Sequence, residues 1–231
     1  MAKNLQYFPQ NTDIENTIRK LRKTIRLSMN GVAAQSMEEK GLRYKQNYGV
    51  ELPRLKQIIS TISPNHQLAQ QLWSLKIRET MILATLLEPT NEFSIQNARN
   101  WLKDIEQIEL VEQTSMNLFS KLPYAKSLAA ECIFSENRWT QIIGLTTAAR
   151  IISLFESEEI EEILKRIVVL SDTEDYYLYR SISVCLARFC RKGEKVAELI
   201  SKKFEQYKNS HKMSFRYIHS EISEEISFLY F

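Results

Sequence analysis

The sequence predicts an all-α fold in which helical hairpins stack side by side. The chain has 231 residues but only five glycines and five prolines, few for a protein rich in tight turns or β-hairpins. Its apolar residues recur at three- and four-residue steps, which is the spacing of one face of an α-helix. A helix, a polar break and a second helix then repeat along the chain. We therefore expect one domain, residues 1–231, with a continuous core.

The first predicted helix is amphipathic and basic. Thr12 or Asp13 can cap it, and cations separate its apolar residues. The apolar residues are Ile14, Ile18, Leu21, Ile25 and Leu27, and the cations are Arg19, Lys20, Arg22, Lys23 and Arg26. Such a helix could follow a row of phosphates, although a solvated amphipathic helix has the same pattern. A second helix from Val32 to Lys40 ends at Gly41, where a glycine commonly follows a helix.

A turn and a proline-started helix separate these N-terminal helices, residues 1–47, from the repeats, residues 48–231. Gly49 permits a positive φ, and Pro53 suits the first turn of a helix, where its missing N–H costs nothing. Five apolar residues after the turn fall on one helical face and predict packing against a neighbouring helix. They are Leu52, Leu55, Ile58, Ile59 and Ile62.

Predicted helix pairs follow Pro64. In the first pair, a helix that contains Leu68, Leu72 and Trp73 precedes a second helix at residues 77–87. The later predicted pairs are 95–105 with 108–122, 125–134 with 139–155, 160–170 with 176–189, and 196–207 with 215–229. In the first four pairs the second helix begins at residue 77, 108, 139 and 176 respectively. Successive starts are therefore 31, 31 and 37 residues apart. This spacing is typical of HEAT- or ARM-like helical hairpin repeats, and we expect a right-handed superhelix with one concave side.

The cysteines and the N-terminus favour a cytoplasmic protein. Cys132, Cys185 and Cys190 form no Cys-x-x-Cys pair and lie in apolar helical patterns, so we expect reduced, buried thiols. The N-terminus has no signal-peptide pattern, and no apolar run reaches the roughly 20 residues of a membrane-spanning helix. We expect a monomer that does not bind a membrane. The net charge of +3 decides little about partners.

The familiar catalytic and nucleotide-binding motifs are absent. The five glycines are scattered, so they cannot form a phosphate loop or a dinucleotide-binding turn. His66, His211 and His219 lack the spacing of a zinc site, and no serine lies in a Gly-x-Ser-x-Gly motif. We therefore expect neither a metal nor a cofactor.

Clusters of basic residues are the better indication of function. Cations gather at the turn before the repeats and again late in the chain, and a concave surface would bring them together to neutralise the phosphates of a nucleic acid. The candidate nucleic-acid-binding residues are Arg43, Lys45, Arg54, Lys56, Arg180, Arg188, Arg191 and Lys192. A mixed surface, on which lysines and glutamates alternate around the repeats, is the alternative interpretation.

The segment around Gly49 resembles the DNA alkylation repair family of helical-repeat glycosylases. That family opens its repeats with Tyr/Phe-x-Gly-Val/Ile-x-x-Pro-x-x-Arg/Lys, and this chain has Gly49, Val50, Pro53 and Lys56 at the same spacing. The resemblance covers roughly residues 41–192. It implies a HEAT-like fold, duplex DNA with alkylated bases as the partner, and hydrolysis of the N-glycosidic bond of alkylated purines in base excision repair.

This chain departs from the family at three places that hold the damaged nucleotide. The family's Trp-Asp-x-Val-Asp segment, an aromatic wall with a carboxylate, reads Ile108-Glu109-Leu110-Val111-Glu112 here, so the acid remains at Glu112. The arginine of the family's Trp-Leu-x-Arg falls on Ile142. The second wall tryptophan, in Lys-Ala-Ile-Gly-Trp, falls on Val184, and the basic Arg180 begins that segment.

These replacements predict weak or absent excision. The family is understood to hold cationic N3- or N7-alkylated purines against aromatic faces while a carboxylate stabilises the positive sugar. Isoleucine and valine offer neither an aromatic face nor a charge. Glu112 is the candidate catalytic residue, and its alternative interpretation is a solvent-facing helical residue. We expect Trp139 to pack between repeats.

Two main functions remain open at the level of sequence, besides a fully active base-excision enzyme that uses other residues. The first is a DNA-binding HEAT-like repeat protein that resembles alkylpurine DNA glycosylases and has little excision activity. The alternative is a helical-repeat scaffold that binds a protein partner and has no enzymatic activity, because helical solenoids commonly present a curved face to peptides or domains.

Overall fold

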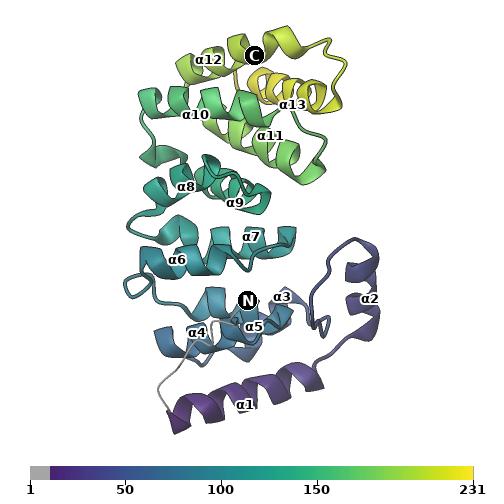
Figure 1. Ribbon diagram of the computed structural model, residues 1–231, viewed down its shortest axis with the longest axis vertical. Coiled ribbons are helices and arrows are strands. Elements are labelled where there is room, and N and C mark those ends of the chain that lie inside the picture. The colour runs from purple at the N-terminus through teal and green to yellow at the C-terminus, as the bar shows by residue number, and fades with distance from the viewer. Residues whose placement is uncertain (1–10, 231) are drawn as a thin grey trace. The chain divides into compact units, whose positions relative to one another are not determined.

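The computed structural model describes residues 11–230, and within this range it contains helices and turns but no β-strand (Figure 1). The chain forms two compact units, residues 1–97 and 98–231. The first unit contains α1 (Thr12–Leu27), α2 (Gly31–Glu39), α3 (Leu52–Ile58), α4 (His66–Ser74) and α5 (Arg78–Leu87). The boundary lies within α6 (Ile95–Leu102).

The second unit continues from α6 as pairs of helices. It contains α7 (Ile108–Asn117), α8 (Ala125–Ile133), α9 (Arg138–Ala148), α10 (Ser157–Leu170), α11 (Tyr176–Cys190), α12 (Glu194–Phe204) and α13 (Met213–Tyr230). Short 3-10 helices follow α7, α9 and α12 at Phe119–Lys121, Ile152–Leu154 and Glu205–Tyr207. The predicted all-α class with HEAT-like hairpins is confirmed, while the right-handed superhelix and the single domain stay predictions.

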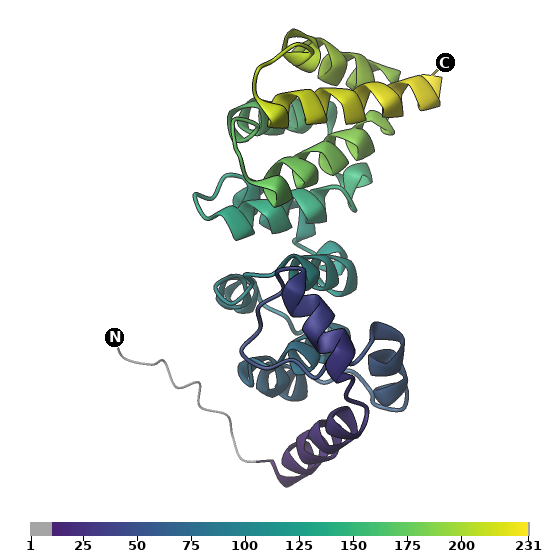
Figure 2. The same ribbon diagram turned by 90° about the vertical axis from the view of Figure 1, so that its right-hand side faces the viewer.

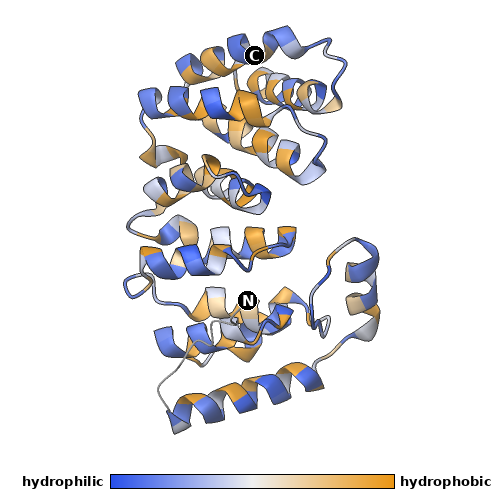
Figure 3. Cartoon of the chain, in the orientation of Figure 1, coloured by the Kyte–Doolittle hydropathy of each residue, from blue (hydrophilic) through white to orange (hydrophobic). Residues whose placement is uncertain are grey.

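Helix α1 begins at Thr12, and its N-cap lies one residue before the first predicted cap. Asn11 is the N-cap, because its side-chain oxygen accepts hydrogen bonds from the backbone N–H groups of Asp13 and Ile14. The prediction of Thr12 or Asp13 as the cap was therefore wrong. Hydrophobic and hydrophilic patches alternate along α1 in Figure 3. The buried apolar residues pack against α3 and α4, whereas Leu27 is exposed, so the predicted apolar face ends before it.

Gly49 has the positive φ that the sequence predicted, at +69°. A Cβ atom there would lie 2.1 Å from the Asn30 carbonyl oxygen and 2.7 Å from the Ala34 nitrogen. The turn therefore requires glycine both for its backbone conformation and for the close approach of the start of α2. The Asn30 N–H donates to the Tyr48 carbonyl at 2.9 Å, which holds the two segments together.

A buried ion pair fixes this turn to α5. Arg78 donates to Glu79 Oε1 at 3.0 Å, and both side chains are almost fully buried. The same carboxylate oxygen accepts from the backbone N–H groups of Tyr48 and Val50, and Arg78 also donates to the Val50 carbonyl. These bonds satisfy the backbone of an irregular segment that has no helical partner.

The proline-started helix is shorter than predicted. Pro53 lies in the first turn of α3, as expected, but the helix ends at Ile58 and buries Leu55 alone. Ile62 lies beyond the helix, so the expected five-residue face does not exist. The Ser60 hydroxyl donates to the Gln57 carbonyl, one of the last acceptors of the helix, and this bond competes with helical continuation.

The second unit stacks its helices in two layers. α9 packs against α7 on one side and α11 on the other, and α11 packs in turn against α13. Figure 2 shows α9, α11 and α13 as successive rungs of this stack. The first helix of each pair lies in the other layer, where α8 contacts α10. A Cβ atom at Gly144 would lie 2.7 Å from the Cys132 Cβ atom. Helices α8 and α9 therefore approach so closely at this position that α9 has no room for a side chain there.

The core of the second unit is apolar and contains the three cysteines. Cys132, Cys185 and Cys190 are buried, as predicted. Burial raises the pKa of the Cys132 and Cys190 thiols to about 12, so both stay protonated at neutral pH. Within residues 11–230 no helix is long and apolar enough to cross a lipid bilayer.

Two predicted helices end early. Residues 108–122 and 139–155 were each expected to be one helix, but α7 ends at Asn117 and α9 ends at Ala148. Ile151 and Phe155 are nevertheless buried, because the irregular segment after α9 packs onto the core. Apolar residues therefore recur at helical spacing beyond the end of α9, so this spacing does not show where the helix ends.

Candidate nucleic-acid interface

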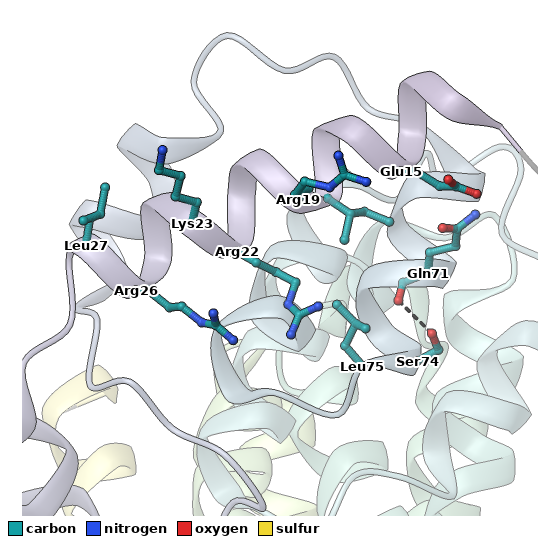
Figure 4. A pocket seen from close by; sticks show the side chains of 10 residues that line it. Glu15, Arg19, Arg22, Lys23, Arg26, Leu27, Gln71, Ser74 and Leu75 are labelled. Atoms are coloured by element: carbon teal, nitrogen blue, oxygen red, sulfur yellow. Dashed lines mark hydrogen bonds between the residues drawn. The ribbon is translucent and has the colours of Figure 1, made fainter.

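A groove in the first unit runs between α1 and α4 and has a volume of about 790 Å³ (Figure 4). One wall is α1 and the other is the C-terminal part of α4 with Leu75, which caps that helix. Four of its ten lining residues are cations: Arg19, Arg22, Lys23 and Arg26. We call this feature the basic groove.

The sequence of α1 places all four cations on one stripe. Their spacing of i, i+3, i+4 and i+7 is that of neighbouring residues on a helix surface. The stripe lies beside the buried stripe of Ile14, Leu21 and Ile25, which anchors α1 to the unit. Seven residues of helix extend about 10 Å, a length that covers roughly three phosphates of one DNA strand at about 3.4 Å each.

None of these four cations forms an ion pair within the described part of the chain, although the Glu15 carboxylate also lines the groove. Arg26 Nε donates to the Tyr48 hydroxyl at 3.2 Å, and Arg22 Nε is buried without a hydrogen-bond partner. Figure 4 shows the Arg22 and Arg26 side chains extending from α1 toward Leu75, whereas Lys23 extends away from it. A buried donor without a partner is costly, so an anion that enters the groove would relieve that cost.

The predicted cations of the first unit lie near one end of α1. Arg43 and Lys45 are exposed in the connection between α2 and α3, where they line a second pocket of about 430 Å³. Arg54 on α3 donates to the Ser28 hydroxyl at 3.1 Å, just past the end of α1. Lys56 is exposed on α3. The Tyr48 hydroxyl, which accepts from Arg26, also accepts from Gln46 at 2.6 Å.

The predicted cations of the second unit divide into two groups. Arg180 and Arg188 are exposed on one stripe of α11, two helical turns apart. Arg191 instead pairs with Glu225 of α13 at 2.5 Å, and this hydrogen bond raises the pKa of the arginine. Lys192 is half-buried and lies close enough to Glu159 to lower the pKa of that carboxylate slightly, after larger effects of the Glu156 backbone and Lys126.

Glu112 is exposed on α7 and makes no hydrogen bond or ion pair with the rest of residues 11–230. Ile108 is half-buried one turn earlier on the same helix. Val184 is 43% exposed on α11, so it offers an aliphatic surface where the family has an aromatic wall. Glu112 therefore projects into solvent, and no ring or cation accompanies it on α7.

Sequence reasoning missed one feature in each unit. Trp139 does contact another repeat, as expected, but it is only half-buried and the Arg138 guanidinium lies 4.5 Å from its ring centroid. It also missed the α4 side of the basic groove, because Gln71, Ser74 and Leu75 carry no motif. The Arg-Trp pair at the start of α9 was the visible signal for the first feature.

Comparisons with known proteins agree with the helical-repeat fold. The model of the DNA alkylation repair enzyme family matches residues 21–216. A solved structure, described as belonging to a new family of proteins related to the HEAT-like repeat DNA glycosylases with affinity for branched DNA structures, superposes with a TM-score of 0.68 and 15% sequence identity. The superposition covers 89% of this chain and 94% of the other. No curated protein matches the chain.

Proposed function

The chain belongs to the DNA alkylation repair enzyme family, and we propose that it binds duplex DNA by neutralising phosphates in the basic groove between α1 and α4. The observation that carries this function is the stripe of four cations, Arg19, Arg22, Lys23 and Arg26, with no carboxylate partner in the described residues. Contacts of this kind supply affinity and position but little sequence specificity.

Branched DNA is the proposed preferred substrate. The structurally similar protein is described as having affinity for branched DNA structures, and branched DNA presents several duplex arms to a protein with more than one basic surface. In this chain the basic groove is one such surface, and the Arg180–Arg188 stripe of α11 is a second. Each would hold a phosphate backbone without reading bases.

Base excision is not part of the proposed function. A departing cationic purine needs an aromatic or anionic environment that is held out of water, because charge stabilisation is weak in a high dielectric. Ile108, Ile142 and Val184 supply neither rings nor charges at the family's positions, and Glu112 faces solvent. The fold and the DNA contacts would then serve binding alone.

Fluorescence anisotropy with a labelled 20-base-pair duplex tests the groove. Replacing Arg22 and Arg26 together by glutamine should weaken binding at least about tenfold, because two charge-assisted contacts are lost. Lys20→Gln is the matched control, since Lys20 is an exposed cation of the same helix that does not line the groove. An equal loss of duplex affinity in the double variant and in Lys20→Gln would refute the proposed site. Wild-type protein that binds no duplex at low salt would refute it as well.

A further inference from the structure

A row of aromatic rings in the second unit has no part in the phosphate contacts. Trp139 on α9 begins the row, three tyrosines of α11 continue it, and Tyr217 on α13 ends it. The centroid distances are 6.0 Å for Trp139–Tyr177, 5.7 Å for Tyr177–Tyr176, 5.5 Å for Tyr176–Tyr179 and 5.2 Å for Tyr179–Tyr217. We call these five rings the aromatic row.

One carboxylate joins the helix ends that carry the first rings. Asp175 is the N-cap of α11 and accepts from the backbone N–H groups of Tyr177 and Leu178. Its other oxygen accepts from Arg138 Nε at 2.9 Å, across to the start of α9. The Arg138 guanidinium is thereby held over the Trp139 ring.

The row is open to solvent at Tyr176, while Trp139, Tyr177 and Tyr217 are half-buried and Tyr179 is buried within the row. Arg138, which is paired with Asp175, lies at one end, and Arg180 lies at the other. Tyr176 is 51% exposed, and its contacts with Tyr177 and Tyr179 are edge-to-face, which leaves much of its surface uncovered. At one end the Arg138 side chain is 49% exposed. At the other end Arg180 is exposed beside Tyr217, where burial raises the pKa of the tyrosine and the arginine lowers it in part.

A row of rings with one exposed member and an arginine at each end suits one ligand in particular. Every nucleic-acid base has a flat face that stacks on aromatic rings or on a guanidinium, while a cation such as Arg180, which is free of ion pairs within the described residues, neutralises an adjoining phosphate. Bases inside a duplex are already stacked and cannot reach the row. We propose that the aromatic row binds unpaired DNA bases, so that the protein prefers DNA in which a single-stranded segment adjoins a duplex.

This preference rests on the proposed function, because the duplex part of such a substrate would be held by the basic groove. It adds a substrate class, namely DNA with unpaired bases at a fork or junction. It also adds a second set of DNA-binding residues, the aromatic row. A chain without the groove contacts should lose affinity for every DNA shape. A chain without the row should lose only the preference for unpaired bases.

The test compares a 20-base-pair duplex with a fork that adds two ten-nucleotide unpaired arms, and the first unpaired position of the fork carries 2-aminopurine. Tyr176→Ala should weaken fork binding about tenfold and leave duplex binding unchanged. Tyr176→Phe, which keeps the ring, should bind the fork like wild type. Phe228→Ala is the control, since that ring is 83% exposed on the same unit but about 16 Å along α13 from Tyr217.

The fluorescence of 2-aminopurine gives a readout that needs no variant. Stacking quenches it, so wild-type protein at saturation should lower the fork signal, and Tyr176→Ala should restore it. An unquenched signal at saturation, or a fork-to-duplex affinity ratio that Tyr176→Ala leaves unchanged, would overturn the aromatic row as a site while the duplex affinity still stands. Absence of binding to either DNA would refute the proposed function as well.

Discussion

At the scale of single residues, Gly49 is a position that only glycine fits. A side chain there meets both an unfavourable backbone region and two backbone atoms of the start of α2. Neither neighbour is the flexible end of a side chain, so neither can move cheaply. The turn at Gly49 also places Tyr48, whose hydroxyl bonds Arg26 of the basic groove.

Gly49→Ala should therefore lower the free energy of unfolding by more than about 2 kcal/mol, the cost of a left-handed backbone for a residue with a Cβ atom plus that of the contact with Asn30. Gly31→Ala is the matched control, because Gly31 lies in α2 with no atom within 4 Å of an added Cβ. We expect it to be neutral or slightly stabilising. Urea unfolding followed by circular dichroism measures both, and equal effects would contradict the role of the turn.

Glu112 provides a second prediction at this scale. Because it faces solvent and lacks the aromatic neighbours of the family, wild-type protein should release no more alkylated purine from methylated duplex DNA than a blank does. Glu112→Gln should bind duplex DNA like wild type. Release that clearly exceeds the blank and disappears in Glu112→Gln would show instead that this carboxylate is catalytic.

At the scale of helices, Asp175 links two elements. It caps α11 and also holds Arg138 at the start of α9, so one side chain contributes to a helix end and to the packing of neighbouring repeats. Loss of the cap alone typically costs about 1 kcal/mol. The pair with Arg138 is half-exposed and contributes less.

Asp175→Ala should accordingly lower the free energy of unfolding by about 1–2 kcal/mol, whereas Asp175→Asn should cost less than half as much because asparagine also caps helices well. Thermal and urea unfolding of the two variants give the comparison. If both substitutions cost the same, the stabilisation comes from the charge on Asp175 and not from its role as a cap.

Helix positions were predictable where apolar spacing and polar breaks coincide. The predicted 77–87 and 176–189 lie within one residue of α5 and α11 at each end. Spacing failed where apolar residues pack without helical geometry, as after α9, and where a serine ends a helix, as after α3. The packing of the segment after α9 is a tertiary contact, about which local apolar spacing carries no information.

The candidate site was less predictable than the fold, because it depends on which helices meet. The cations of α1 were visible in the sequence, but their groove needs α4, about 50 residues later. Arg191 looked like a free cation in a basic cluster, yet its partner Glu225 is 34 residues away. The aromatic row likewise joins residues of α9, α11 and α13 that share no motif.

At the scale of the whole molecule, the two units carry separate cations. The basic groove offers four, and the α11 stripe adds Arg180 and Arg188. Each phosphate contact contributes about −0.9 to the slope of log affinity against log salt. The slope should therefore be about −3.6 if the groove alone binds DNA and about −5.4 if both surfaces contact it.

The most direct test of phosphate binding in the basic groove is this slope, measured by fluorescence anisotropy between 50 and 200 mM salt for wild-type protein and for the variant with Arg22 and Arg26 replaced by glutamine. We expect a wild-type slope of about −3.6 or steeper, and a variant slope that is shallower by about two. A wild-type affinity that does not change with salt, or an equal slope in the variant, would contradict the account.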